Sequence, residues 1–207
     1  MKTYNSISSF AETELLIKHS RFIGRAYPLK ETDCTLSLCN EAKKYLAEIK
    51  AKHKDASHNC YAYIIDDGNM RASDDGEPQG TAGAPILSVL KKRSLQNTLV
   101  IVTRYYGGIN LGSGGLVSAY TAAASAVLDK AGVKVFTQGI IAKIKFGYEQ
   151  EKIVEQIIKK HEIKLLKTEY AEFINYEITA QQEKWQEVKN TLAGFKIQIE
   201  SENICWI

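Results

Sequence analysis

NTLVIVTRYYGGINLGSGGLVSAYTAAASAVLDKAG, residues 97–132, is the stretch of sequence that decides the fold. Asn97–Thr103 is rich in β-branched residues and predicts a buried strand, which a glycine-rich loop follows. A helix is then expected from about Gly115 to Lys130, ending at Gly132, because glycine is common just beyond a helix C-terminus. The uncharged run Tyr105–Leu128 is long enough to span a bilayer, but its five glycines and its polar residues favour a loop and a buried helix.

The residues before this strand predict a hairpin and a helix. Two β-like runs between Glu12 and Leu29 are separated by Lys18-His19-Ser20, which is typical of a hairpin. Asp33 can cap the start of a helix, and apolar residues then recur at helical spacing. These apolar positions are Leu36, Cys39, Ala42, Leu46 and Ile49. Cys39 is therefore expected in the core.

A strand, a loop and a second helix are expected between residues 57 and 93. SHNCYAYIID, Ser57–Asp66, predicts a strand. The segment from Asp66 to Gly80 is so rich in glycine and aspartate that it predicts a long irregular loop. A helix should begin near Thr81 and end at Lys91-Lys92-Arg93, where cations suit the helix dipole.

The pattern changes to shorter, alternating elements beyond Gly132, which places a domain boundary near residues 134–138. Strands are expected near residues 140–146, 163–169, 172–180 and 195–200, with one helix around 153–158 and another around 185–192. The resulting order βαββαβ is the ferredoxin-like arrangement. The sequence therefore predicts an α+β protein with two domains, residues 1–135 and 136–207.

The 207 residues have the composition of a globular protein, with 44% hydrophobic and 25% charged residues. A net charge of +3 does not by itself indicate binding to a polyanion. Residues 1–135 hold 17 basic and 13 acidic residues, and residues 136–207 hold 10 and 11, so any preference for anions belongs to the first domain. The four cysteines lack CxxC spacing and the first residues lack an apolar signal segment, so a cytoplasmic protein with reduced thiols is expected.

Two glycine-bearing segments each open a helix and together predict an anion pocket. They are SDDGEPQGTAGAP, Ser73–Pro85, and TRYYGGINLGSGGL, Thr103–Leu116. Glycines let a backbone approach a ligand closely, and a helix N-terminus offers unpaired N–H groups to an oxyanion. Arg104 can grip a phosphate or carboxylate, with Tyr105 and Tyr106 as stacking faces. The candidate ligand-binding residues are Thr81, Gly83, Arg104, Tyr105, Tyr106, Gly107, Gly108, Gly112, Ser113, Gly114 and Gly115, together with His58.

A second interpretation of the same segments needs no ligand. The glycines then serve only the strand-to-helix turns, and Asp75 or Glu77 lies at the helix N-terminus and neutralises Arg104. Neither segment matches a Walker or dinucleotide-binding fingerprint, so spacing alone leaves both interpretations open.

His58 and Cys60 lie two residues apart on a predicted strand, so their side chains share one face. This geometry suits a metal pair or a thiolate–imidazole pair. Two ligands do not make a metal site, and the acidic loop, Asp74, Asp75 and Glu77, adds only oxygen atoms. We therefore expect a small buried cysteine beside a hydrogen-bonded histidine, and no metal or cofactor.

Several segments resemble the IMPACT/YigZ family: His58-Asn59-Cys60, Ser73–Pro85, Val102–Leu116, and Ser20-Arg21-Phe22 near the start. With the second domain, the resemblance covers essentially the whole chain. It implies a left-handed βαβ first domain similar to domain IV of elongation factor G, and a ferredoxin-like second domain similar to domain V of that factor. Eukaryotic relatives carry an additional RWD domain and regulate translation through a kinase pathway, a role that is not expected here.

The resemblance implies a non-enzymatic protein associated with nucleic acid or the ribosome and linked to regulation of translation. RNA or the ribosome is the expected partner, with no DNA sequence specificity and no membrane association. One alternative is a nucleotide-binding enzyme similar to the GHMP kinases. The segment Asn110–Leu116 loosely resembles the loop with which those kinases bind phosphate. Another is a module that binds a protein partner through some of its 11 tyrosines.

Overall fold

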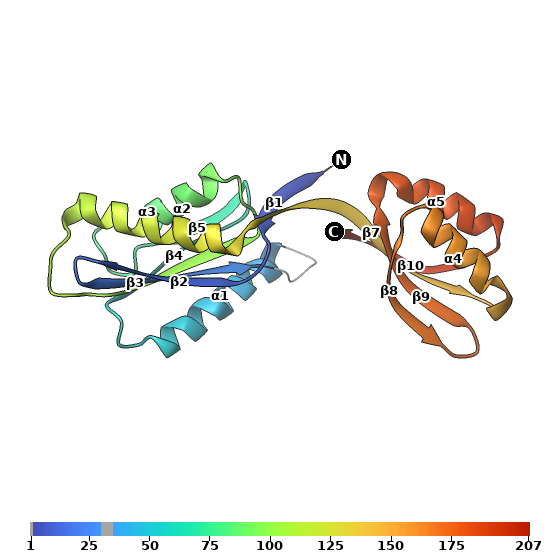
Figure 1. The fold of residues 1–207 in the computed structure, drawn as a ribbon, viewed down its shortest axis with the longest axis horizontal. Coiled ribbons are helices and arrows are strands. Elements are labelled where there is room, and N and C mark those ends of the chain that lie inside the picture. Colours follow the sequence, from blue (N-terminus) through green and yellow to red (C-terminus); the bar gives the residue numbers. More distant parts are fainter. Residues whose placement is uncertain (1, 30–34) are drawn as a thin grey trace. The chain divides into compact units, whose positions relative to one another are not determined.

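The computed structural model describes residues 2–29 and 35–207. These residues form two β-sheets and five α-helices (Figure 1). The strands are β1 (Thr3–Ile7), β2 (Ala11–Ile17), β3 (Ser20–Pro28), β4 (His58–Asp66), β5 (Asn69–Ser73), β6 (Thr98–Tyr105), β7 (Val133–Phe146), β8 (Lys164–Tyr170), β9 (Ile174–Gln181) and β10 (Gln198–Trp206). The helices are α1 (Thr35–Lys52), α2 (Gly83–Lys92), α3 (Gly112–Ala131), α4 (Glu151–Lys160) and α5 (Gln182–Gly194), and Tyr148–Gln150 form a 3-10 turn. The α+β class is confirmed.

The chain divides into two compact units between Val135 and Phe136. We call Tyr4–Val135 the first unit. The second unit consists of Phe136–Ile207 together with Lys2 and Thr3. The division falls inside the range 134–138 at which the character of the sequence changes.

The first unit is a five-stranded sheet covered by helices on both faces (Figure 1). Its strand order is β2-β3-β6-β4-β5, and every neighbouring pair is antiparallel. Alternate residues of β6 serve different layers, because side chains point to opposite faces of a strand. Leu99 and Ile101 pack against α1, whereas Val100 and Val102 join the core beneath α2 and α3. The apolar run of β6 is thus explained by burial on both faces.

Two crossovers in this sheet each join parallel strands through a helix and skip one strand between them. α1 joins β3 to β4, and α2 joins β5 to β6. The hand of a crossover depends on the direction of its first strand, its direction across the sheet and the face that its helix covers. The two crossovers differ in all three respects, because their helices also lie on opposite faces. Three reversals give opposite hands, so one crossover is left-handed. Left-handed crossovers are uncommon, and the family resemblance implied one.

The second unit has the strand order β10-β7-β9-β8, with antiparallel neighbours. α4 and α5 supply Val154, Trp185 and Val188 to a core whose other side comes from alternate residues of β7 and β9. The element order is βαββαβ, as the sequence predicts. Strand β1, which was not expected from the sequence, also pairs with β7.

Three predicted boundaries are wrong. The segment from Asp66 to Gly80 is not irregular throughout, because Asn69–Ser73 form β5 and pair with β4. Helix α3 starts at Gly112, three residues before the predicted start. The last strand starts at Gln198 and runs to Trp206, while Phe195 is a half-exposed residue after α5. The predicted cap Asp33 lies outside the described residues.

Even α3, which is uncharged over most of its length, does not qualify as a membrane span. No helix in the described part of the chain combines the length and the apolar character needed to cross a bilayer.

Candidate functional site

Four connections meet at one end of the first sheet, which we call the loop end. Strand β6 ends beside the starts of β3 and β4, with Arg104 opposite both Phe22 and His58. Strand β5 also ends there, because Ser73 pairs with Tyr61 near the start of β4. The four connections are Lys18–His19, His53–Ser57, Asp74–Ala82 and Tyr106–Leu111. Both predicted glycine-bearing segments are therefore brought to the same end.

Arg104 is buried and forms an ion pair with the buried Glu77. Its Nη1 donates to Oε1 of Glu77 over 2.7 Å, and its Nη2 donates to the Ser20 hydroxyl over 3.4 Å. The Tyr120 hydroxyl donates to the same Glu77 oxygen over 2.8 Å. Glu77 therefore neutralises Arg104, as the interpretation without a ligand expected.

The guanidinium of Arg104 also contacts two aromatic rings. Its central carbon lies 5.5 Å from the ring centre of Phe22 and 5.4 Å from that of Tyr106, distances that suit cation–π attraction. Phe22 belongs to the buried core, whereas Tyr106 is 53% exposed. Arg104 thus links a core ring to a surface ring.

Asp74 occupies the start of α2. Its carboxylate accepts hydrogen bonds from the backbone N–H groups of Gly80, Ala82 and Gly83, at 2.8 to 3.0 Å. Burial opposes ionisation of this carboxyl, but the backbone donors outweigh it and lower the pKa of Asp74 below its usual value. The residue that fills this helix start is therefore Asp74, where Asp75 or Glu77 was expected. Thr81, at the same start, is buried and donates its hydroxyl to the carbonyl of Pro78.

Gly83 is required by packing at this helix start. A Cβ at this position would lie 2.7 Å from the backbone nitrogen of Ser73, so only glycine fits without a shift. This close approach brings α2 directly onto the end of β5.

Asp75 and His58 are also held by the protein itself. The Asp75 carboxylate accepts from the backbone N–H of Asn59 over 2.7 Å and pairs with Lys50 over 2.6 Å. The Nδ1 of His58 donates to the carbonyl of Asp75 over 2.9 Å, and its Nε2 lies 3.8 Å from Glu77. The acidic loop thus folds inward. Among the described residues, no group of three or more acidic, His or Cys side chains is arranged to hold a metal ion.

Cys60 is a buried thiol without the character of a nucleophile. Its Sγ donates to the carbonyl of Asp74 over 2.9 Å and lies 3.3 Å from the Tyr120 hydroxyl. Burial raises the pKa of the thiol to about 12, so the reactive thiolate is scarce at neutral pH. The geometry is that of a hydrogen-bonded core cysteine.

The start of α3 is open, in contrast to that of α2. Asn110 accepts a hydrogen bond from the Gly112 N–H, but no described side chain caps the residues that follow. The first turn holds no acidic residue, and Gly112, Ser113 and Gly114 are exposed, with Gly115 half-buried. Positive φ angles of 84° at Gly108 and 71° at Gly112 shape this loop, which other residues would adopt only with strain.

The loop before α3 is fixed against the turn between β2 and β3. The Gly107 N–H donates to the Ser20 hydroxyl over 3.2 Å. A Cβ at Gly107 would overlap the carbonyl oxygen of His19, so this contact requires glycine. Lys18 and His19, both exposed and both with positive φ, form the turn itself. The open start of α3 thus follows a fixed loop that touches a basic turn.

Tyr105 points to the other face of the sheet from Arg104 and Tyr106. Its hydroxyl lies 2.9 Å from Nδ1 of His53 and donates to Asp55 over 3.3 Å. The guanidinium of Arg21 covers its ring at 5.4 Å. The predicted pair of stacking tyrosines is therefore split, and Tyr106 has the exposed ring.

A second buried arginine, Arg25, was missed by sequence reasoning. It pairs with Glu12, donates to the Thr103 hydroxyl over 3.1 Å, and donates to Nε2 of His53 over 2.8 Å. The sequence signal was an arginine that interrupts the apolar residues between Phe22 and Tyr27. Together Arg25 and His53 hold Tyr105 in place.

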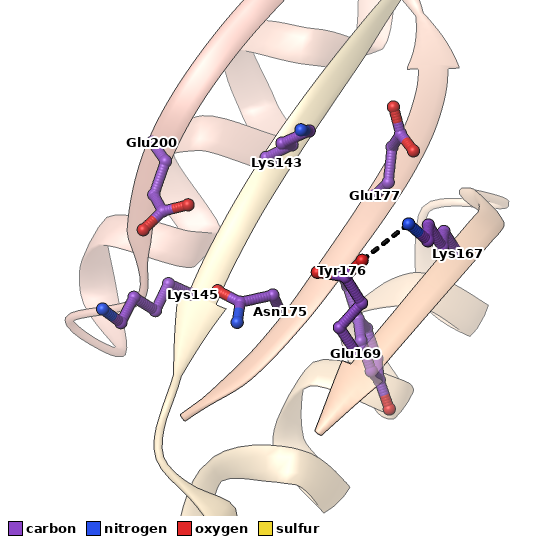
Figure 2. Close-up of a pocket in the computed structure, with 8 residues that line it drawn as sticks. All are labelled: Lys143, Lys145, Lys167, Glu169, Asn175, Tyr176, Glu177 and Glu200. Carbon is purple, nitrogen blue, oxygen red and sulfur yellow. Dashed lines mark ion pairs between the residues drawn. The ribbon is translucent and has the colours of Figure 1, made fainter. Parts of the chain in front are cut away.

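The second unit has a shallow pocket on the sheet face opposite its helices (Figure 2). Its cavity volume is about 310 Å³. Three lysines and three glutamates line it with one asparagine and one tyrosine: Lys143, Lys145, Lys167, Glu169, Glu177, Glu200, Asn175 and Tyr176. Lys167 and Glu169 form an ion pair of 2.6 Å. Because the charges balance, the pocket offers no attraction for a polyanion.

The loop end lies within a known protein domain. The Impact N-terminal domain matches residues 18–128, which include all four connections of the loop end. The chain belongs to the IMPACT family. Its relatives include IMPACT family member YvyE of Bacillus subtilis, 37% identical over 182 residues that cover 86% of this chain and 79% of that protein. IMPACT family member YigZ of Escherichia coli is 33% identical over 183 residues, 86% of each chain.

A solved structure is similar to this protein over nearly the whole chain. A crystal structure described as that of a hypothetical protein has a TM-score of 0.65 and 30% sequence identity to this chain. The match covers 96% of this chain and 97% of that one. Both units therefore belong to the shared architecture.

Proposed function

We propose that this IMPACT family member binds RNA at the loop end of its first unit, on or near the ribosome, and takes part in regulation of translation. The observation that carries the proposal is the open start of α3, where Ser113 and Gly114 are exposed and no described side chain supplies a cap. Helix N-termini bind phosphate through such free N–H groups. The positive surplus of residues 1–135, 17 basic against 13 acidic, supports a polyanionic partner.

The two glycine-bearing segments have different roles in this proposal. Asp74 accepts the N–H groups at the start of α2, and Glu77 neutralises Arg104. Neither this helix start nor Arg104 is therefore free to hold a phosphate. The phosphate instead approaches the start of α3, which follows the loop that packs against the basic turn Lys18–His19 at Gly107. Arg104 is then a positioning residue, because it holds Ser20, which in turn holds Gly107.

An enzyme similar to the GHMP kinases fits this geometry less well. Phosphoryl transfer needs carboxylates that are free to bind Mg²⁺. Each acidic side chain of the loop already accepts a hydrogen bond from an N–H donor of the protein itself: Asp74, Asp75 and Glu77. RNA binding without catalysis therefore accounts better for the closed acidic loop.

The test places a negative charge at the open helix start. Ser113→Glu should lower RNA affinity about tenfold or more, because the carboxylate takes the place of the phosphate and repels it. The same change should preserve or raise thermal stability, since acidic residues suit a helix N-terminus. The matched control is Ala122→Glu, an exposed position of the same helix about 13 Å further along, beyond the screening length.

Affinity is measured by fluorescence anisotropy with single-stranded RNA, structured RNA and ribosomes over a range of salt concentrations. Wild type and Ala122→Glu should bind alike, with log affinity falling linearly against log salt. Equal binding by Ser113→Glu would remove the start of α3 from the site. Absence of binding to every RNA would refute the proposed function, and saturable Mg-ATP binding with turnover would favour the kinase alternative.

A further inference from the structure

The exposed ring of Tyr106 is held in one orientation before any ligand arrives. Its inner neighbour is the Arg104 guanidinium, at 5.4 Å from the ring centre. Its backbone N–H donates to the Ser57 hydroxyl over 3.1 Å, and the next residue, Gly107, is fixed against His19. An aromatic ring constrained in this way loses little conformational freedom when a partner covers it.

Arg104 is itself buried and held by polar and aromatic neighbours, which makes it a firm support for the ring. Glu77 and Ser20 hold two of its nitrogens, and the Phe22 ring contacts the same guanidinium from the core. Phe22 is fully buried and meets Tyr120 edge-on, with ring centres 5.3 Å apart. The contacts therefore lead from the core, through a cation, to an aromatic ring at the surface.

We propose that the outer face of Tyr106 stacks an unpaired nucleobase of single-stranded RNA. This inference rests on the proposed function and adds the class of RNA to it. A duplex hides its base faces, so only single-stranded, looped or flipped-out bases can cover the ring. Aromatic rings beside a phosphate-binding element are the usual platform for single strands, because every base has a π-face. Tyr106 lies in the loop that leads into the open start of α3, so a base and its phosphate can be bound together.

The closing experiment separates stacking from phosphate binding. Two single-stranded RNAs of equal length are compared, one with all its bases and one with abasic sites at its central positions, so that the number of phosphates is unchanged. Wild type should bind the intact RNA about tenfold or more tightly than the abasic one. Tyr106→Ala should lose that preference and keep its affinity for the abasic RNA, and Tyr106→Phe should keep both.

The matched control is Phe10→Ala, because Phe10 is an aromatic residue of the same unit with 52% exposure, close to the 53% of Tyr106. This variant should behave as wild type. If Tyr106→Ala keeps the wild-type preference for intact RNA, the stacking proposal is wrong although RNA binding stands. If wild type binds neither single strand but does bind structured RNA or ribosomes, stacking fails and the proposed function stands. If wild type binds none of these RNAs, both fail. Tighter binding of a duplex than of the intact single strand would also overturn the inference.

Discussion

Oε1 of Glu77 lies 2.7 Å from Nη1 of Arg104, in a place where each side chain is less than a tenth exposed. The Glu77 carboxylate also accepts a hydrogen bond from the Tyr120 hydroxyl, and it lies 3.8 Å from Nε2 of His58. One carboxylate thus joins the acidic loop to β6, β4 and α3. Its first role is structural, because it compensates a buried cation that would otherwise be very costly.

Glu77→Gln should therefore destabilise the protein strongly. The amide keeps the shape but removes the charge, and breaking a buried ion pair from one side costs about 3 to 5 kcal/mol. The free energy of unfolding is measured by urea titration. Replacing both partners, as in Glu77→Gln with Arg104→Met, should recover part of the loss. The control Glu14→Gln removes an exposed partner of Arg21 and should have a much smaller effect. A Glu77→Gln protein as stable as wild type would contradict the role assigned to the pair.

Asp74→Asn should reduce stability at pH 7 by about 0.5 to 2 kcal/mol, because the capping carboxylate is lost. The pKa of Asp74 is lower in the folded protein than in the unfolded chain, so its contribution is complete at neutral pH. That contribution disappears as the pH falls below about 4 and through the folded value. Urea titrations at pH 7 and pH 3 should therefore show a smaller acid-induced loss in the variant. The exposed Asp67→Asn serves as the charge control, and an equal loss in Asp74→Asn and wild type would exclude the cap.

The parts of the fold that the sequence predicts are those with a strong apolar pattern. Strand β6 is apolar at both odd and even positions, and α3 has a continuous run of small and apolar residues, so both are evident from the sequence. Strand β5, NMRAS, is a short strand at the sheet edge, largely polar and exposed. Its pairing with β4 is decided by backbone hydrogen bonds, which leave no apolar pattern in the sequence.

The candidate site is predictable in its location but not in its pairing. Glycine-bearing loops indicate the loop end, because their conformations and close approaches demand glycine. Which acid meets Arg104 and which caps α2 depends on how the loop folds over Gly76 and Gly80, both at positive φ. The sequence favours Asp75 or Glu77 for both roles, whereas the folded chain gives Asp74, Asp75 and Glu77 each a different partner.

Cys60→Ala should cost about 1 to 3 kcal/mol, since it leaves a small cavity in the core and a carbonyl without its donor. Because burial raises the pKa of this thiol to about 12, Cys60 should resist alkylation by iodoacetamide in the native protein. Mass spectrometry should show Cys39 and Cys205, both half-buried, modified first, and Cys60 only after denaturation. Rapid native modification of Cys60, or loss of a bound metal in the variant, would make it a functional thiol.

Residues 136–207 expressed alone should fold cooperatively, because the fragment contains a complete βαββαβ set with its own core. At 72 residues the fragment should be only marginally stable, since small domains bury a smaller share of their surface. A single sigmoidal urea transition, with dispersed amide signals in NMR spectra, is the expected result. A non-cooperative transition would show that residues before Phe136 are needed for folding.

His53 should make the first unit sensitive to mild acid, because its two ring nitrogens have fixed and different partners. A guanidinium can only donate, so Nε2 of His53, 2.8 Å from Arg25, must be the acceptor. The ring proton therefore sits on Nδ1 and is donated to the Tyr105 hydroxyl. If Nε2 of His53 gained a proton, its N–H would face the N–H donor of Arg25, and the imidazolium would lie beside the guanidinium cation.

Burial, then Arg25 and Lys52, hold the pKa of His53 below its usual value, and Asp55 and Glu12 only partly oppose them. The unfolded chain therefore binds this proton more readily than the folded protein. Stability conferred by the neutral ring is complete above about pH 6.5 and is lost as the pH falls through the folded value. Urea titrations between pH 7.5 and 5.5 should show a decline in wild type and in the exposed-turn control His19→Gln. His53→Gln should be flat over this interval, which lies above the range in which Asp74 titrates. A decline in His53→Gln equal to that of wild type would mean that other groups take up the proton.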